Sequence, residues 1–363
     1  MKVPFLDLSR FDILLQEELK QTFQKVLEKG VFSGGDEVDI FCEKVKSILK
    51  SRFAIPCANG TDALELALRA LEIGPGDEVI VPALTWVSTA EAVLMVGAKP
   101  IFWDTDQDGL LAENWEKAIT PRTKAVVPVH LYGKMNKMDQ LLEKAKANRL
   151  FIIEDAAQAF GAVQKGKAAG TFGDVGCMSF YPTKNLGALG EAGMCLTQDP
   201  ELSEKISLLI NHGQPRRDEH VLVGRNSRID SLQAGFLNVF LSYFDAFQKR
   251  RKYLAIRYLT ELSAIMELRF LTGISEEDHS IHLFPVFLER RNELKIYLTE
   301  RGVGTGIHYP SILPEMSPYQ VQGEFINSKN CSHRGISLPL NPWLEDREQT
   351  YIIACIRAFF GKK

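Results

Sequence analysis

The sequence predicts an α/β fold: a mostly parallel sheet of seven strands with helices on both faces, followed by a smaller C-terminal α/β domain. Short apolar runs alternate with segments of helical periodicity as far as residue 198, which is the pattern of repeated strand–helix units. The strand-like runs are apolar at successive positions, as in strands covered on both faces. Past about residue 230 longer helical segments replace this alternation, so we expect a large domain at 1–245 and a small domain at 246–363.

The seven expected strands are short apolar runs bounded by turn residues. They lie at 53–58, 74–84 (which opens with a Gly-Pro-Gly-Asp turn), 98–104, 124–130, 149–155, 174–181 and 192–198.

The expected helices are set by apolar spacing. In the segment 59–74, Leu64, Ala67, Leu68 and Leu71 fall on one helical face. Further helical segments are expected at 88–97, 113–119, 137–148, 230–245 and 247–264. The small domain should add strands near 279–288 and 302–309.

Composition excludes several classes of function. The chain has 363 residues, 45% of them hydrophobic, and a net charge of −3 with mixed signs, which gives no electrostatic case for nucleic-acid binding. It has no apolar run long enough to cross a membrane and no signal peptide at its start, so we expect a cytoplasmic protein. The six cysteines are scattered without a CxxC pair, so we expect neither a disulfide framework nor a metal site.

Chemically versatile residues cluster where strands end, which is where ligands gather in open α/β sheets. Gly60 and Thr61 open the helix after the first strand, and the first turn of a helix offers free N–H groups to an anion. The alternative is an ordinary helix cap by Asn59 or Thr61. Trp86 follows the second strand, where it would either stack on a flat ring or belong to the core.

Two further clusters follow the fifth and sixth strands. Asp155 ends a strongly apolar strand, so its carboxylate needs a cationic or hydrogen-bonding partner unless it only caps a helix. Ser179 ends the next strand, and Lys184 lies in the turn SFYPTKNLGALGEAG. A lysine in a turn is ordinarily a solvated surface charge, and its neighbours decide whether it is more.

Together these side chains match the needs of pyridoxal phosphate. This cofactor requires a lysine amine for a Schiff base, a carboxylate beside the pyridine nitrogen, donors for a phosphate, and a flat apolar partner for its ring. Lys184 can supply the amine and Asp155 the carboxylate. Gly60, Thr61 and Ser179 can bind the phosphate, and Trp86 can stack on the ring.

The sequence also resembles the DegT/DnrJ/EryC1/StrS family of sugar aminotransferases, which are fold-type I pyridoxal phosphate enzymes. The resemblance runs along almost the whole chain, and the pairing of EDAAQ with SFYPTKNLGALGEAG is its most specific part. The matching segments are VPFLDL (3–8), FSGGDEV (32–38), NGTDALELAL (59–68), GDEVIVPALTWVSTAEAV (76–93), PVHLYG (128–133), IEDAAQAFGA (153–162), GDVGCMSFYPTKNLGALGEAG (173–193), GRNSRIDSLQAGFL (224–237) and GIHYP (306–310).

The resemblance implies the remaining roles. Gln158 would contact the ring hydroxyl, and Asn226 would reach the phosphate of the neighbouring subunit in a homodimer with shared active sites. From the residues alone, Asn226 could equally be a cap for the helix that starts near Asp230. His308 and Tyr309 would border the sugar site.

The implied reaction moves an amino group from an amino acid, expected to be L-glutamate, to a keto sugar linked to a nucleotide. The segment VPFLDL looks more like the branch that aminates at C3 than the branch that aminates at C4. One departure concerns substrate contacts, because Pro314 and Met316 stand where many relatives carry a histidine and a glutamine.

Other activities share this scaffold. The dehydratase branch replaces the lysine with histidine, which the presence of Lys184 disfavours. Desulfurases and aldolases share the fold, so the fold alone does not decide between them. A pyridoxal phosphate-binding regulator without catalytic activity is the remaining alternative.

Overall fold

The computed structural model describes residues 1–362 and confirms the predicted α/β class. Seven strands form one sheet in the order β1-β9-β8-β5-β4-β2-β3. Their bounds are β1 (Phe53–Cys57), β2 (Glu78–Pro82), β3 (Lys99–Trp103), β4 (Thr123–Val126), β5 (Phe151–Asp155), β8 (Val175–Ser179) and β9 (Gly193–Thr197). All seven predicted strands are therefore present, each within its predicted segment or one residue from it.

The sheet is parallel except for β9. The strands β8, β5, β4, β2 and β3 pair in parallel, whereas β9 runs antiparallel to both of its neighbours, β1 and β8. The carboxyl ends of β1, β2, β4, β5 and β8 consequently point to one edge of the sheet, and this edge is where the candidate site lies.

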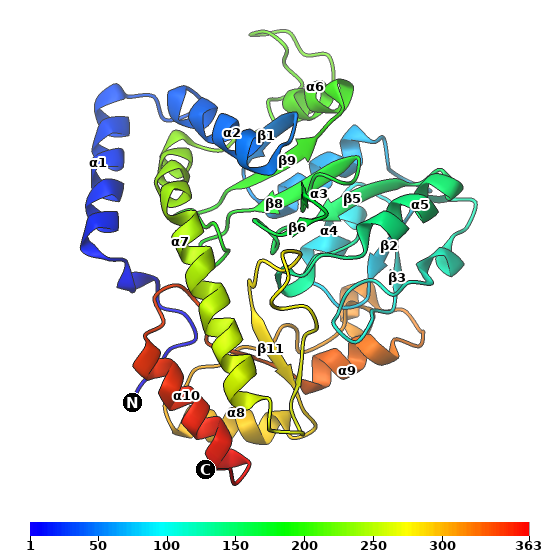
Figure 1. The fold of residues 1–363 in the computed structure, drawn as a ribbon. Coiled ribbons are helices and arrows are strands. Elements are labelled where there is room, and N and C mark those ends of the chain that lie inside the picture. The colour runs from blue at the N-terminus through cyan, green and yellow to red at the C-terminus, as the bar shows by residue number, and fades with distance from the viewer. Residues whose placement is uncertain (363) are drawn as a thin grey trace.

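Helices cover both faces of this sheet, as Figure 1 shows. Side chains alternate along each strand, so Val79 and Val81 of β2 join one core while Ile80 joins the other. The first core includes α3 (Gly60–Ala70), α4 (Ser88–Met95) and α6 (Pro200–Leu209). The second includes α1 (Ile13–Lys29), α2 (Asp36–Leu49), α5 (Met138–Asn148) and the first half of α7 (Ser231–Leu262).

Helix α7 corrects one prediction. The segments 230–245 and 247–264 were expected as two helices, but they form the single helix α7, which Asp230 caps by accepting a hydrogen bond from the backbone N–H of Gln233 at 2.7 Å. No proline or glycine lies between the two segments, so nothing in the sequence ends the first helix there. The division at residue 245 remains a prediction, and that residue lies inside α7, which runs the length of the molecule in Figure 1.

Two further expectations are corrected. The helical segment at 113–119 is only the short 3-10 turn η2 (Trp115–Ala118). The segment 302–309 forms no strand and makes only isolated bridges, Val303 to Val3 and Gly306 to Ser337. Glycine explains this outcome, because a Cβ on Gly304 would lie 2.6 Å from the backbone nitrogen of Phe5, so the N-terminal segment occupies the space beside this backbone.

The C-terminal residues form a smaller α/β arrangement at the end of α7 where both termini lie (Figure 1). Its antiparallel sheet is β10 (Arg269–Phe270), β11 (Phe284–Phe287) and β12 (Gly335–Leu338), and its helices are α8 (Arg291–Glu300), α9 (Ile326–Arg334) and α10 (Asp346–Phe359). The remaining elements are short: β6 (Val163–Gln164), β7 (Lys167–Ala168), η1 (Leu8–Arg10), η3 (Leu131–Gly133), η4 (Leu313–Glu315) and η5 (Ser317–Tyr319).

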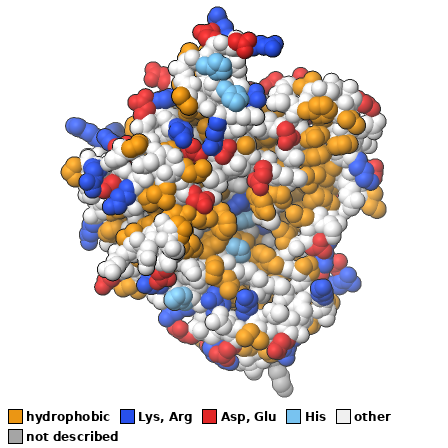
Figure 2. All heavy atoms as spheres, turned by 180° about the vertical axis from the view of Figure 1, so that it is seen from behind, with side chains coloured by type: hydrophobic (Ala, Val, Ile, Leu, Met, Phe, Trp, Pro, Cys, Tyr) orange, Lys and Arg blue, Asp and Glu red, His pale blue; other side chains and the backbone are white. Residues whose placement is uncertain are grey.

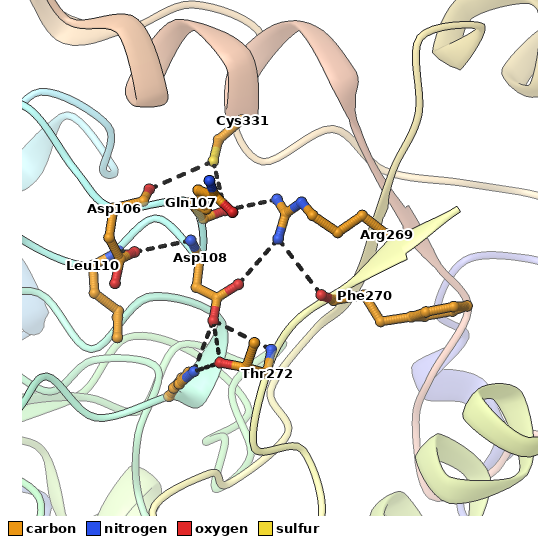
Figure 3. Close-up of polar contacts among 9 residues, drawn as sticks. Asp106, Gln107, Asp108, Leu110, Arg269, Phe270, Thr272 and Cys331 are labelled. Atoms are coloured by element: carbon orange, nitrogen blue, oxygen red, sulfur yellow. Dashed lines mark hydrogen bonds and ion pairs between the residues drawn. The ribbon is translucent and has the colours of Figure 1, made fainter. Parts of the chain in front are cut away.

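The loop after β3 ties this C-terminal part to the large sheet (Figure 3). The carboxylate of Asp108 accepts a hydrogen bond from Lys134 Nζ at 2.8 Å, from Arg269 Nη1 at 3.1 Å and from Thr272 Oγ1 at 2.5 Å. Because the side chain of Asp108 is 8% exposed, losing either cationic partner would leave a largely desolvated charge. These contacts of Asp108 therefore fix the position of the segment around β10 against the sheet.

No helix within residues 1–362 is long and apolar enough to cross a membrane.

Candidate functional site

A cavity of about 990 Å³ opens at the carboxyl edge of the sheet. Its wall contains every predicted site residue except Asn226: Gly60, Thr61, Trp86, Asp155, Gln158, Ser179, Lys184, His308 and Tyr309. The predicted site residues are therefore brought together from the ends of four strands, β1, β2, β5 and β8, and from the segment before η4.

Two consecutive carboxylates end β5, and the alternation of side chains along the strand separates them. Glu154 is fully buried and accepts hydrogen bonds from His130 Nε2 at 3.0 Å and from the backbone N–H groups of Gly170, Phe172 and Gly173 at 2.6–2.9 Å. Four donors satisfy this carboxylate, so its role is to hold the surrounding loops. Asp155 faces the cavity instead.

The carboxylate of Asp155 has few partners. It accepts hydrogen bonds from Thr89 Oγ1 at 2.8 Å and from the backbone N–H of Ala157 at 3.3 Å. Burial raises the pKa of Asp155, and the hydrogen bond from Thr89 and the nearby charge of Lys184 only partly oppose this shift. A buried carboxylate in this state stabilises a cation brought by a ligand. Thr89 was not identified from the sequence, although it lies in the first turn of α4, the helix that follows β2.

Lys184 lies in the tight turn that follows β8. Its backbone N–H donates to the carbonyl of Tyr181 at 2.8 Å, and a Cβ on Gly187 would lie 2.5 Å from the carbonyl oxygen of Pro182. The turn therefore closes on itself and presents the lysine to the cavity. Burial lowers the pKa of Lys184 to about 8, and the charge of Asp155 opposes part of that shift. The residue as a whole is only half-buried, so this shift reflects the crowding of protein atoms around its amine.

Hydroxyl groups and a helix start form a cup suited to an anion. Thr61 Oγ1 donates to Ser88 Oγ at 2.7 Å, and both residues line the cavity with Gly60 and Ser179. A Cβ on Gly60 would lie 2.7 Å from the Cβ of Ser179, so only glycine lets the start of α3 approach the end of β8 this closely. Asn59 caps α3 by accepting from the backbone N–H of Asp62 at 2.8 Å, which leaves earlier N–H groups of the helix for a ligand.

Trp86 and Gln158 border the middle of the cavity. Trp86 is 55% exposed, so the alternative that it belongs to the core is wrong. Its ring lies 5.5 Å from that of Tyr309, centroid to centroid. Gln158 is held from two sides, because its Oε1 accepts from the backbone N–H of Tyr132 at 2.7 Å and its Nε2 donates to Tyr309 Oη at 3.1 Å.

His308 is fixed opposite the strand ends. Its Nδ1 lies 2.9 Å from Ser337 Oγ, and its carbonyl accepts from Tyr132 Oη at 2.6 Å. Burial, with a smaller contribution from the charge of Lys184, lowers the pKa of His308 to about 4. The imidazole is therefore neutral at neutral pH and acts as a hydrogen-bonding group there.

Asn226 does not line the cavity of its own chain. It is exposed, and its Oδ1 accepts from Arg228 Nε at 3.2 Å. The cap of α7 is Asp230, so the alternative that Asn226 caps this helix is wrong. The segment between α6 and α7 projects from the body at the top of Figure 1.

Several residues of the cavity wall were not identified from the sequence. Ser88, Arg251 and His282 all lie in segments that read as ordinary helix or strand. Arg251 stands in the basic run KRRK (249–252) of a helical segment, and such a pattern is more often a surface position.

These residues fit the pyridoxal phosphate expected from the sequence. The glycine-lined cup matches a phosphate, the under-partnered carboxylate of Asp155 matches a protonated ring nitrogen, and the amine of Lys184 is desolvated enough to react as a free base. No group of side chains within residues 1–362 is arranged to hold a metal ion.

Known proteins resemble this chain along nearly its whole length. The model of the DegT/DnrJ/EryC1/StrS aminotransferase family matches residues 14–357. The chain is 39% identical to the UDP-N-acetyl-3-dehydro-alpha-D-glucosamine 3-aminotransferase of Acidithiobacillus ferrooxidans, covering 98% of this chain and 97% of that protein. It is also 35% identical to a protein of Geobacillus stearothermophilus named pleiotropic regulatory protein, over 99% of both chains.

A solved structure shares the fold along its whole length. The crystal structure of Streptomyces venezuelae DesV, in complex with a ketimine intermediate, superposes with a TM-score of 0.95 at 38% identity, covering 100% of this chain and 99% of that one.

The lowered pKa of Lys184 predicts how this amine reacts in the cofactor-free protein. Acylation requires the neutral amine, so Lys184 should reach half of its maximal rate near pH 8 rather than near the ordinary lysine value of 10.5. Asp155→Asn removes a charge that favours the ammonium form, so the midpoint should move lower still. Peptide mass mapping after a timed acylation series measures both, and a wild-type midpoint near 10.5 would contradict the desolvated site.

Proposed function

Because this chain belongs to the DegT/DnrJ/EryC1/StrS aminotransferase family, we propose that it transfers the amino group of L-glutamate to C3 of a keto sugar linked to a nucleotide. It is a pyridoxal phosphate-dependent transaminase. The observation that carries the proposal is the convergence of Lys184, Asp155 and the anion cup on one cavity. The relative named as a 3-aminotransferase supports C3 over C4.

In this proposal each side chain holds one part of the cofactor. Lys184 forms the covalent link, Asp155 pairs with the ring nitrogen, Gln158 contacts the ring hydroxyl, and Trp86 stacks on the ring. Gly60, Thr61 and Ser179 bind the phosphate. Ser88 joins them, because its hydroxyl accepts from that of Thr61 at 2.7 Å.

The chemistry then depends on moving one proton. Bound pyridoxal phosphate supplies an electron sink for the negative charge that develops when a carbon beside the nitrogen loses its proton. Lys184 Nζ removes and returns that proton, and a pKa of about 8 lets it do both near neutral pH. Asp155 stays ionised when a cation pairs with it, which keeps the positive charge at the ring nitrogen.

The sugar would enter on the side of His308 and Tyr309, which line the cavity across from the strand ends. Pro314 and Met316, the departures from many relatives, do not line it. Instead the turn η4 is tied to the end of β2, because the backbone N–H of Leu313 donates to the carbonyl of Ala83 at 2.8 Å. Hydrogen bonds to the sugar at this end would therefore come from His308 and Tyr309.

The alternative of a regulator without catalytic activity has one point in its favour, the name of the Geobacillus relative. The placement of Lys184, Asp155 and Gln158 in one cavity weighs against it, since a protein that only binds the cofactor has no need for a proton-transfer group with a lowered pKa.

Spectroscopy on the pure protein tests the function. L-Glutamate should convert the absorbance of the bound cofactor to that of the pyridoxamine form, and a 3-keto nucleotide sugar should restore it faster than its 4-keto isomer. Lys184→Ala should slow the first conversion at least about 100-fold, because a positioned acid–base group is lost. Wild-type absorbance that no amino acid changes would favour the regulator.

We also propose that the active unit is a homodimer in which Asn226 serves the partner's phosphate site. Asn226 is exposed, and so is Val223, at 92%, on the segment between α6 and α7. Exposed large apolar side chains, including Phe32, Trp86 and Tyr181, supply further surface for a second copy to cover. In Figure 2 hydrophobic side chains gather on both sides of a central hollow. A twofold interface would complete both sites at once.

Mixing two inactive variants tests the shared site. Lys184→Ala and Asn226→Asp, exchanged at equal amounts, should form heterodimers with one intact site and recover roughly a quarter of wild-type activity by random pairing. The matched control mixes Lys184→Ala with Asp155→Asn, whose defects both lie in the home subunit, so no site is intact and activity stays absent. If the first mixture stays inactive while mass spectrometry shows exchange, Asn226 serves its own chain.

A further inference from the structure

Arg251 is a buried cation at the wall of the cavity that has no counter-ion. It lies inside α7, its residue is 4% exposed, and no carboxylate within residues 1–362 forms an ion pair with it. Burial lowers its pKa to about 10, and no nearby acid opposes that shift. A guanidinium that stays charged in such a place is costly unless an anion joins it.

The hydrogen bonds of Arg251 leave one edge of its guanidinium free. Nη1 donates to the carbonyl oxygens of Ile281, His282 and Leu340 at 3.2–3.4 Å. Nε is buried without a partner, and Nη2 makes no hydrogen bond to any residue from 1 to 362. Nε and Nη2 form the side of the fork that pairs with both oxygens of a carboxylate.

This free edge belongs to a positive end of the cavity close to Lys184. Arg251 and Lys184 line the main cavity together and also share a small void of about 30 Å³. His282 lines the same cavity, and burial first and then the charges of Lys184 and Arg251 lower its pKa well below the usual histidine range.

The acidic residues that line the cavity either pair with groups other than Arg251 or are exposed to solvent. Asp62 pairs with Arg225 Nη2 at 2.5 Å, Asp155 accepts from Thr89, and Glu191 is exposed. None of them contacts Arg251, so the anion that its free edge needs has to arrive with a ligand.

We infer that Arg251 binds the α-carboxylate of the amino donor. This inference rests on the proposed transamination, in which Lys184 moves a proton at the donor's α-carbon, so the α-carboxylate must lie within one bond of that carbon. A carboxylate presents two oxygens that match the two nitrogens of this edge. The α-carboxylate is common to all amino acids, so the inference does not depend on glutamate being the donor.

A purely structural role for Arg251 is the competing explanation, because its Nη1 also holds the carbonyls of two loops. Arg291 provides a matched control. It is likewise buried, without an acidic partner, and its Nη1 donates to the carbonyls of Ser332 and Gly335 at 3.3 and 3.1 Å, but it does not line the cavity. Its substitution reports what the loss of carbonyl contacts alone does.

The experiment compares the two half-reactions of the cofactor-loaded protein by stopped-flow absorbance. Arg251→Gln should raise the KM for L-glutamate and for 2-oxoglutarate about 10- to 100-fold, which is the loss expected for one charge-assisted pair. Its rate with the keto sugar should stay within about threefold of wild type. Wild-type protein should prefer L-glutamate over 4-aminobutyrate, which lacks the α-carboxylate, and Arg251→Gln should lose this preference. Arg291→Gln should change neither the KM values nor the preference.

A binding measurement adds a readout independent of turnover. Glutarate, a dicarboxylate without an amine, should bind the cofactor-loaded wild type and Arg291→Gln in calorimetry, and bind Arg251→Gln about 10-fold more weakly or not at all. The inference would be overturned if Arg251→Gln slowed the reactions with the amino acid and with the keto sugar equally, or if Arg251→Gln bound glutarate as tightly as the wild type does. If no amino acid reacts with the wild type, the proposed function fails, while the glutarate comparison still decides the role of Arg251.

Discussion

The site depends on how β5 separates two adjacent buried carboxylates. Consecutive residues of a strand face opposite sides, so Glu154 and Asp155 cannot share partners. Glu154 collects four donors from His130 and from the backbone of 170–173, which locks the loops beside the site. Asp155 keeps only Thr89 and one backbone N–H. The hydrogen bonds of Glu154 thus stabilise the fold, whereas the carboxylate of Asp155 is available to a cationic ligand.

Electrostatics then divides the cavity into regions with different preferences. At the strand ends, the buried carboxylate of Asp155 stabilises a bound cation. The start of α3 and the neighbouring hydroxyl groups favour a bound anion. Across from them, Lys184 shares the cavity with Arg251, His282 and His308, and burial lowers the pKa of its amine while the charge of Asp155 opposes part of that shift. A ligand that carries a phosphate, a protonated ring and a carboxylate-bearing substituent would match all three regions.

Local pattern in the sequence was enough for the strands and for most of the site. Apolar runs ended by polar residues marked all seven strands, and because parallel strands end at one edge, Gly60, Asp155 and Lys184 could be placed together before the fold was seen. Properties that depend on long-range contacts were out of reach. Thr89 and Arg251 look like ordinary helix positions, and only the packing of α4 and α7 reveals what they face. The segment 302–309 looked like a strand because the space taken by Phe5 is not visible in its own sequence.

The central claim is that Asp155 keeps a charge unpaired for the ring nitrogen of the cofactor. Nitrogen-15 NMR of the protein loaded with ring-labelled pyridoxal phosphate tests this most directly. We expect a protonated ring nitrogen across the neutral pH range in the wild type and in Thr89→Val, and a deprotonated one in Asp155→Asn, because a neutral amide cannot stabilise the pyridinium charge. A ring nitrogen that is protonated to the same extent in the wild type and in Asp155→Asn would contradict it.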